Sequence, residues 1–165
     1  HRPIPLMDIN IIANTIEGLI KSGKIKSFGV SNFTADQMYM FKGKVEILYN
    51  QINLSLTHLD HMFDGTLEYM QANNILPMAY SPLGSYFKEG NNKIKKVVES
   101  LKDKYSCTDY QLLISWLLKH PSKVYPVIGT TKSDRIKKSM KSLKIEIELI
   151  DWFELLEASL GNRVP

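Results

Sequence analysis

The chain has 165 residues, of which 44% are hydrophobic and 23% are charged, a composition typical of one soluble globular domain. The net charge is +4, but the lysine clusters have no aromatic residues between them, which argues against a nucleic-acid surface. No apolar run approaches the roughly 18 residues of a membrane span and the start lacks a signal-peptide pattern, so we expect a cytoplasmic protein without membrane contact.

The first third of the chain predicts helices that alternate with strands. Residues 8–23 carry apolar side chains at helical spacing and end at a glycine suited to a left-handed cap. Residues 24–30 alternate polar and apolar side chains, which predicts a strand. A capping box at 34–37 then begins a helix, which Gly43 ends.

The rest of the chain continues the same order. Strands are predicted at residues 45–52 and 124–128, which are rich in aliphatic and aromatic side chains, and at residues 75–80, a short apolar run interrupted by Pro77. Amphipathic patterns between and after these strands predict helices at residues 62–70, 94–105, 108–120, 130–143 and 148–160.

Strands separated by helices run parallel, because each return to the sheet needs a crossover. Four strand-helix units make half of a parallel (β/α)8 TIM barrel, which typically needs about 250 residues. We therefore expect residues 1–165 to form the carboxyl-terminal part of a single α/β barrel domain, supplying strands 5–8 with their helices. A doubly wound sheet is the weaker alternative, because no predicted strand is followed by a Gly-x-Gly-x-x-Gly turn.

Small, polar or aromatic residues lie at the ends of the four predicted strands. This is the edge where parallel α/β folds bind ligands. They are Ser31, Asn32, Gln51, Tyr80, Ser81, Gly129, Thr130 and Thr131. Ser, Asn and Gln can satisfy an amide group without adding charge, and a tyrosine ring can cover one face of a flat ligand. The set therefore suits a nicotinamide dinucleotide. Each residue considered alone has a structural alternative to a ligand contact. Asn32 can serve only to turn the chain, and Ser31 can serve only to cap a backbone group.

These strand ends and their neighbours resemble the carboxyl-half motifs of the aldo-keto reductases. The matching segments are Gly29-Val30-Ser31-Asn32-Phe33, Asn50-Gln51, Tyr80-Ser81-Pro82-Leu83-Gly84 and Val127-Ile128-Gly129-Thr130-Thr131. They occur in the family's order and spacing over essentially the whole chain, and His1-Arg2-Pro3 resembles the family's fourth-strand histidine motif. The resemblance implies a barrel that binds NADP(H) and reduces aldehyde or ketone groups of small carbonyl substrates to alcohols.

The resemblance also implies a role for each matching residue. Ser31, Asn32 and Gln51 would hold the carboxamide, Tyr80 would stack on the nicotinamide, and Ser81 and Leu83 would contact the pyrophosphate. The adenosine end would be held by Gly129, Thr130, Thr131, Arg135 and Ser139. A helix amino terminus that follows a strand independently suits an anion, and Arg135 can fork onto a 2′-phosphate. Many family members have lysine at position 129 and asparagine at 139, so NADH stays open as a cofactor.

Only one of the family's catalytic Asp, Tyr, Lys and His residues has a candidate here, which is His1. We therefore expect the chain alone to be inactive, and its missing amino-terminal half to cover the open sheet edges; an isolated chain should self-associate. The alternative from another class is a non-catalytic nucleotide-binding module, like the potassium-channel β subunits of that family.

The other histidines and the cysteine predict no further chemistry. His58 and His61 are spaced for one helical face, but no carboxylate or cysteine partner is evident, so we expect surface positions and no metal site. His120 ends a helix and is expected to interact with its last carbonyls. Cys107 has no second cysteine with which to form a disulfide.

Overall fold

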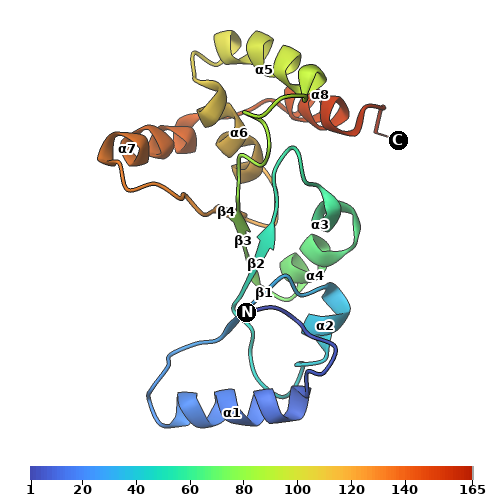
Figure 1. The fold of residues 1–165 in the computed structure, drawn as a ribbon, viewed down its shortest axis with the longest axis vertical. Helices are drawn as coiled ribbons and strands as arrows, with labels where there is room; N and C mark the ends of the chain where they lie inside the picture. The colour runs from blue at the N-terminus through green and yellow to red at the C-terminus, as the bar shows by residue number, and fades with distance from the viewer. Residues whose placement is uncertain (165) are drawn as a thin grey trace.

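Four short strands form one parallel sheet, in the order β1-β2-β3-β4. The computed structural model describes residues 1–164. Each strand is connected to the next through at least one helix (Figure 1), which confirms the order predicted from the sequence. The strands are β1 Gly29–Ser31, β2 Tyr49–Asn53, β3 Leu76–Tyr80 and β4 Tyr125–Pro126. Within the described residues, β1 and β4 each pair on one side only, so both edges of the sheet are open.

Three helices begin at their predicted positions because local side chains cap them. Asp8 accepts hydrogen bonds from the backbone N–H groups of Asn10 and Ile11, the capping box predicted at 34–37 is formed, and a second capping box is formed at 108–111. The helices are α1 Ile9–Lys21, α2 Ala35–Tyr39, α3 Asp60–Phe63, α4 Thr66–Ala72, α5 Asn92–Lys104, α6 Asp109–Leu118, α7 Ser133–Lys141 and α8 Leu149–Leu160, with a 3-10 turn, η1, at Ser142–Lys144.

Four predicted elements differ in the structure. The strand expected at 45–52 begins only at Tyr49, and the strand expected at 124–128 is regular only at Tyr125–Pro126. The strand expected at 24–30 is regular only from Gly29, because its partner β2 begins at Tyr49 and a strand needs a neighbour to pair with. The helix expected at 62–70 is divided into α3 and α4. The break lies at Gly65, whose φ of +82° is left-handed and cannot continue an α-helix.

One face of the sheet is covered by the helices and forms the core. Ile52 and Ala79 are fully buried there, in a cluster that includes residues of α5, α6 and α8. A second cluster joins Val30 of β1 to α1 and α2. Trp116 and Trp152 stack with ring centroids 5.0 Å apart, and each indole N–H donates to the other residue's carbonyl at 3.1 and 3.0 Å. This reciprocal pair fixes α6 against α8.

The other face of the sheet carries more exposed side chains. Successive residues of a strand point to opposite faces, so the residues beside buried Asn50 and Ile52 point away from the core. Two tyrosines point to this face: Tyr49 of β2 is 38% exposed and Tyr125 of β4 is 54% exposed. The other members of the face are Gly29, Ser31, Gln51, Asn53, Leu76, Met78 and Tyr80. In a closed barrel the corresponding face is the packed interior.

Candidate functional site at the carboxyl ends of the strands

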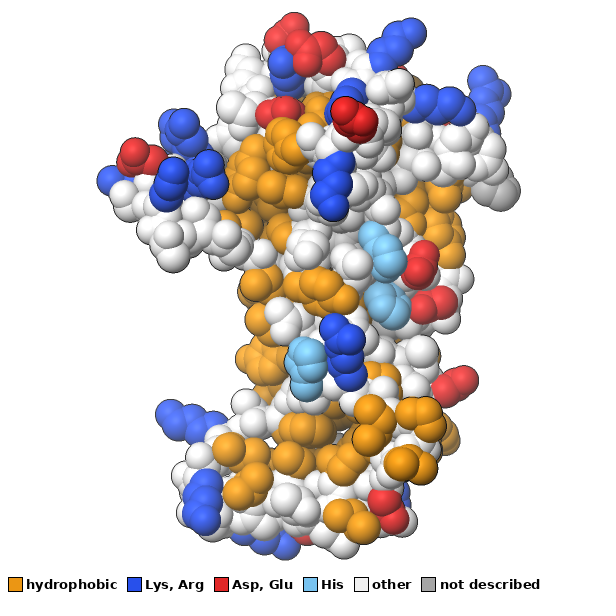
Figure 2. All heavy atoms as spheres, viewed as in Figure 1, with side chains coloured by type: hydrophobic (Ala, Val, Ile, Leu, Met, Phe, Trp, Pro, Cys, Tyr) orange, Lys and Arg blue, Asp and Glu red, His pale blue; other side chains and the backbone are white. Residues whose placement is uncertain are grey.

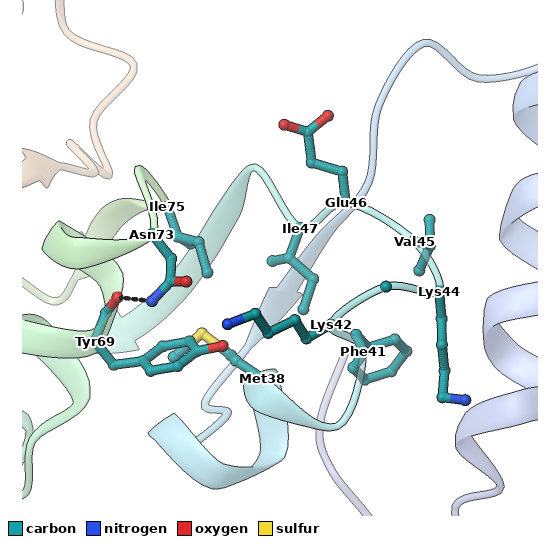
Figure 3. A pocket seen from close by; sticks show the side chains of 11 residues that line it. Met38, Phe41, Lys42, Lys44, Val45, Glu46, Ile47, Tyr69, Asn73 and Ile75 are labelled. Carbon is teal, nitrogen blue, oxygen red and sulfur yellow. Dashed lines mark hydrogen bonds between the residues drawn. The ribbon is translucent and has the colours of Figure 1, made fainter.

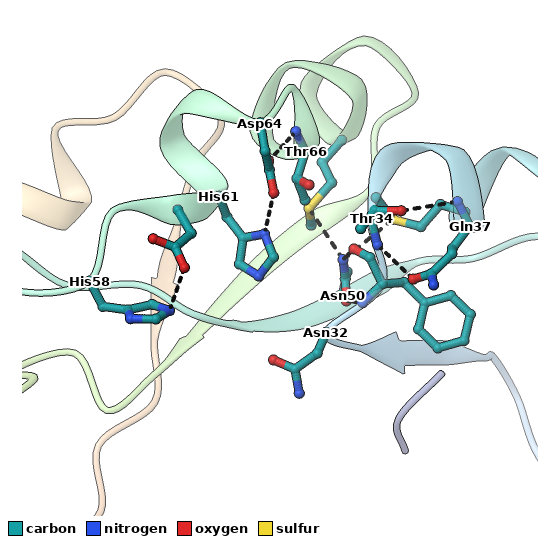
Figure 4. Close-up of polar contacts among 12 residues, drawn as sticks. Asn32, Thr34, Gln37, Asn50, His58, His61, Asp64 and Thr66 are labelled. Atoms are coloured by element: carbon teal, nitrogen blue, oxygen red, sulfur yellow. Dashed lines mark hydrogen bonds and ion pairs between the residues drawn. The ribbon is translucent and has the colours of Figure 1, made fainter. Parts of the chain in front are cut away.

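The corner that follows β1 is held in place by a side chain of β2. Asn50 is fully buried, and its Nδ2 donates to the Phe33 carbonyl at 2.8 Å while its Oδ1 accepts from the Phe33 N–H at 3.4 Å (Figure 4). Between β1 and Phe33, Asn32 adopts a φ of +58°, a conformation that asparagine tolerates better than most residues. The Asn50 amide therefore fixes the position of the Phe33 backbone, and with it the turn that carries Ser31 and Asn32.

A chain of hydrogen bonds joins three strands at this end of the sheet. The Tyr80 hydroxyl donates to Asn32 Oδ1 at 3.0 Å, and Asn32 Nδ2 donates to Ser31 Oγ at 3.1 Å. The Ser31 hydroxyl in turn donates to the Gln51 carbonyl at 2.9 Å. The structure thus brings together all four residues predicted to face the nicotinamide. The Asn32 amide retains one N–H and one lone pair for a further partner.

A buried acceptor beside this chain has no partner within the described residues. Asn53 follows Gln51 on the same face of β2 and pairs in register with Tyr80. Its Oδ1 is buried and accepts no hydrogen bond. An unpaired buried acceptor is costly, and a ligand N–H group placed there would satisfy it. This observation fits an amide-bearing ligand.

A cavity of about 270 Å³ lies next to the β3 and β4 ends. Its walls come from the loop that follows β3, from the segment between β4 and α7, and from one residue each of α6 and α7: Ser81, Pro82, Leu83, Gly84, Ile128, Gly129, Thr130, Tyr110 and Arg135. Gly84 has a φ of +52°, and a Cβ there would lie 2.0 Å from Thr57 Oγ1. The loop therefore packs closely against Ser55 and Thr57. The Thr57 hydroxyl Oγ1 accepts a hydrogen bond from the Ser85 N–H at 2.8 Å.

Two of the predicted adenosine contacts lie outside this cavity. Thr131 is exposed and does not line its wall. Ser139 is buried, its hydroxyl lies 2.6 Å from that of Tyr110, and it donates to the Arg135 carbonyl at 2.7 Å. Ser139 therefore supports Tyr110, a wall residue that the sequence analysis did not single out, and does not itself face the cavity.

The histidines are placed differently from the sequence expectation in one respect. His61 Nδ1 lies 2.9 Å from Asp64 Oδ2 and His58 Nε2 lies 3.7 Å from Asp60 Oδ2, so both rings do have carboxylate partners (Figure 4). The Asp64 carboxylate also accepts from the Thr66 N–H and thereby starts α4. Among residues 1–164 no group of three or more potential ligands could hold a metal ion.

His1, which the family resemblance suggests as a catalytic residue, is exposed.

Another cavity, of about 380 Å³, lies at the opposite end of the sheet (Figure 3). Its wall includes Phe41, Lys42 and Ile47 before β2, and Tyr69 and Ile75 before β3. These segments precede the strands, so the cavity is at the amino-terminal edge, away from the polar strand ends. It contains none of the residues that were predicted to bind a cofactor.

The fold and this site define a class of protein. A parallel α/β sheet presents neutral amide and hydroxyl groups at three adjacent strand ends, and a cavity with one arginine follows the last strands. This arrangement is typical of barrels that bind a dinucleotide at their carboxyl-terminal edge. Within the described residues, no helix is both long and apolar enough to cross a membrane.

Comparison with known proteins identifies the family. A model described as "Aldo/keto reductase family" matches residues 1–158, and the chain belongs to this family. It is 35% identical over its whole length to the uncharacterized oxidoreductase YcsN of Bacillus subtilis and covers 58% of that protein. It is 33% identical over 99% of its length to a 6-dehydroglucose reductase of Agrobacterium fabrum, of which it covers 57%. A yeast relative, at 28% identity over 98% of the chain and 54% of the relative, is named an NADPH-dependent alpha-keto amide reductase of Saccharomyces cerevisiae.

Solved structures show the same fold. The thermostable aldo-keto reductase Tm1743 superposes with a TM-score of 0.87 over 96% of this chain and 57% of its own, at 24% identity. Aldose reductase from Giardia lamblia gives a TM-score of 0.76 over 99% of this chain and 53% of its own, at 23% identity. The chain therefore spans somewhat more than half the length of these relatives.

Proposed function

We propose that this chain is the carboxyl-terminal, cofactor-binding portion of an NADP(H)-dependent carbonyl reductase. The reaction reduces an aldehyde or ketone of a small substrate to an alcohol. The observation that carries the proposal is the hydrogen-bonded chain from Tyr80 through Asn32 and Ser31 to Gln51, at the carboxyl ends of three adjacent strands. The oxidoreductase and reductase names of its relatives favour an enzyme over a non-catalytic module.

The residues fit the two ends of the cofactor in different ways. Ser31, Asn32 and Gln51 would hold the carboxamide, because Asn32 keeps a free N–H and lone pair and the nearby Asn53 acceptor is unpaired. Ser81 and Leu83 would face the pyrophosphate from the loop that follows β3. Gly129, Thr130 and Arg135 would take the adenosine end, with Thr131 beside them and Ser139 acting through Tyr110.

The chemistry divides between this chain and the rest of the barrel. The nicotinamide held by these residues would supply the hydride for the carbonyl carbon. Tyr80 would cover one face of the ring, so that the other face is turned to the substrate, while His1 would hold the substrate oxygen. By the family resemblance, the proton comes from a tyrosine in the amino-terminal half, and no residue of this chain is assigned that role. The chain by itself is therefore expected to be inactive.

Replacing Asn32 by glycine tests the carboxamide site without straining the backbone. Glycine tolerates the φ of +58° at this position, so Asn32→Gly removes the amide side chain and leaves the turn. Loss of about two neutral hydrogen bonds should weaken NADPH binding to the complete protein by roughly tenfold, measured by fluorescence titration. Asn74→Gly is the matched control, because Asn74 has a φ of +56° and is exposed at the turn between α4 and β3.

Equal affinity of the Asn32→Gly variant and the unaltered protein would contradict the carboxamide role. Equal weakening in both glycine variants would show that the effect arises from backbone entropy, because the two substitutions change the turn in the same way. Complete absence of NADPH and NADH binding to the unaltered complete protein would overturn the proposed function itself.

A further inference from the structure

The cavity at the amino-terminal edge of the sheet combines buried apolar side chains with accessible polar ones (Figure 3). Its volume of about 380 Å³ is within the range of sites for small organic ligands. None of its wall residues belongs to β1 or β4, the two strands with an open edge. Helix α2, which contributes to the wall, lies at the end of the molecule where hydrophobic side chains gather on the face drawn in Figure 2. Four wall side chains are apolar and buried: Met38, Phe41, Ile47 and Ile75.

One cation of the wall is directed along the cavity. In Figure 3 the Lys42 side chain points toward Tyr69. The side chains of Lys44 and Glu46 point away from Tyr69 in the same view. The Lys42 ammonium group lies 5.6 Å from the centroid of the Tyr39 ring and forms no ion pair among residues 1–164. It is therefore available to pair with an anion.

The Tyr69 hydroxyl is a second donor. The one hydrogen bond drawn in the wall joins Asn73 Nδ2 to the Tyr69 backbone carbonyl at 2.8 Å, so it leaves the hydroxyl available. Burial raises the pKa of this hydroxyl above its ordinary value of 10.0, and Tyr39 adds to the effect, so the hydroxyl keeps its proton at neutral pH. One ammonium group and one neutral hydroxyl match a single carboxylate, which accepts hydrogen bonds and carries one negative charge.

We propose that this cavity is a second ligand site, for a small carboxylate with a flat apolar body, and that its occupant tightens dinucleotide binding at the opposite edge of the sheet. The carboxylate would accept hydrogen bonds from Lys42 and Tyr69, while the apolar body would pack against Met38 and Phe41. The ligand site stands on the cavity alone. The effect on dinucleotide binding rests on the proposed function.

Two wall residues contact the groups that hold the turn at Asn32. Asn50 Nδ2, which donates to the Phe33 carbonyl at 2.8 Å, also donates to Met38 Sδ at 3.5 Å. The ring of Phe41 packs against that of Phe33, with centroids 6.0 Å apart. A ligand packed on Met38 and Phe41 restricts their motion and that of the turn. NADPH binding then has less ordering left to do, and becomes tighter.

The test titrates benzoate, and benzamide as its neutral counterpart of similar shape, calorimetrically into the complete protein. Lys42→Gln should weaken benzoate by about fivefold and benzamide by less than about twofold, because the ion pair forms only with the charged ligand. Tyr69→Phe should weaken benzoate by about threefold. Lys44→Gln is the matched control: it removes the same charge two positions away, but its side chain points away from Tyr69. It should change benzoate binding by less than about twofold.

Three outcomes would overturn the ligand site. Benzoate could bind no more tightly than benzamide, which would exclude recognition of the charge. Its affinity could be unaffected by both Lys42→Gln and Tyr69→Phe, which would place it elsewhere on the protein. Lys42→Gln and Lys44→Gln could weaken it equally, which would reduce the effect to net charge.

The coupling between the two ends of the sheet has its own measurement. Saturating benzoate should tighten NADPH binding by at least about threefold in a fluorescence titration, and NADPH should tighten benzoate by the same factor. Lys42→Gln should need about fivefold more benzoate for the same effect. An unchanged or weakened NADPH affinity would overturn the coupling. If the unaltered protein bound benzoate as expected but neither NADPH nor NADH, the proposed function would fail while the ligand site stood.

Discussion

Replacing Asp151 by asparagine should destabilise the protein by removing a charge that ties α8 to α5. Asp151 is buried, its Oδ2 lies 2.7 Å from Lys104 Nζ, and the Tyr105 hydroxyl donates to the same oxygen. Hydrogen bonds to a charged group contribute about 1.5–3 kcal/mol when fully buried. The Lys104 side chain is 42% exposed, so solvent screens its share of the interaction. We therefore expect Asp151→Asn to cost about 1–2 kcal/mol at neutral pH.

The pH dependence of this effect follows from the pKa of Asp151. Burial by itself raises this pKa, but the hydrogen bonds from Lys104 and Tyr105 outweigh burial and bring the pKa below its ordinary value of 3.8. The stabilisation is therefore fully present at pH values above the ordinary pKa. It is lost as the pH falls through the lower, folded-state value. The difference between the two proteins should shrink below about pH 5, because a protonated Asp151 resembles asparagine.

Urea denaturation of the purified protein, followed by circular dichroism at several pH values, measures both effects. Glu154→Gln is the control: Glu154 lies exposed on the same helix, has no ion pair among the described residues, and its loss changes the net charge equally. Its free energy of unfolding should change by less than about 0.5 kcal/mol. A cost of Asp151→Asn as small as that of the control, or one that stays constant down to acid pH, would refute this reasoning.

Three further predictions concern the site and the sheet edges. Gly84→Ala should lower the melting temperature and nucleotide affinity together, because the new Cβ would lie 2.0 Å from Thr57 Oγ1 and 2.4 Å from Ser55 Oγ; unchanged values would mean that the loop can move freely. Arg135→Ala should weaken NADPH more than NADH, by roughly 1.5–3 kcal/mol in a fluorescence titration, and an equal loss would make Arg135 structural. The 165-residue chain alone should lack NADPH-dependent aldehyde reductase activity and should dimerise or aggregate through β1, β4 and the apolar groove of about 740 Å³ beside β4; a stable monomer in light scattering would contradict the self-association.

The sequence predicted which residues share one edge of the sheet, because each position follows from its place at a strand end. Ser31, Gln51 and Tyr80 lie at one edge because parallel strands bring their carboxyl ends together. The sequence did not reveal that Asn50 braces Phe33, since an asparagine in an apolar strand has no local signal for its partner. The carboxylate partners of His58 and His61 were overlooked although Asp60 and Asp64 lie only two and three residues away, a spacing that can be recognised in a sequence.

His120 shows the limit of an argument from position alone. Its place at the end of α6 suggested a cation near the last carbonyls, but its ring Nδ1 accepts from the Ser122 N–H at 3.3 Å. Burial also lowers its pKa, which favours the neutral ring and outweighs the opposing effect of Glu68. Only the packed structure determines how deeply such a ring is buried, and hence which of its nitrogen atoms can act as an acceptor.

The sequence by itself determined the helix starts, the strand order and the kinds of side chain at the strand ends. Capping side chains, glycines and apolar periodicity act over a few residues, so their effects are visible before folding. The tertiary structure decided the strand lengths, because pairing stops where a neighbour ends, and it decided which polar groups meet. Tyr80 and Asn32 are 48 positions apart yet share a hydrogen bond, and Ser139 is turned from the ligand cavity toward Tyr110. Such contacts depend on how whole elements pack, and no local pattern encodes them.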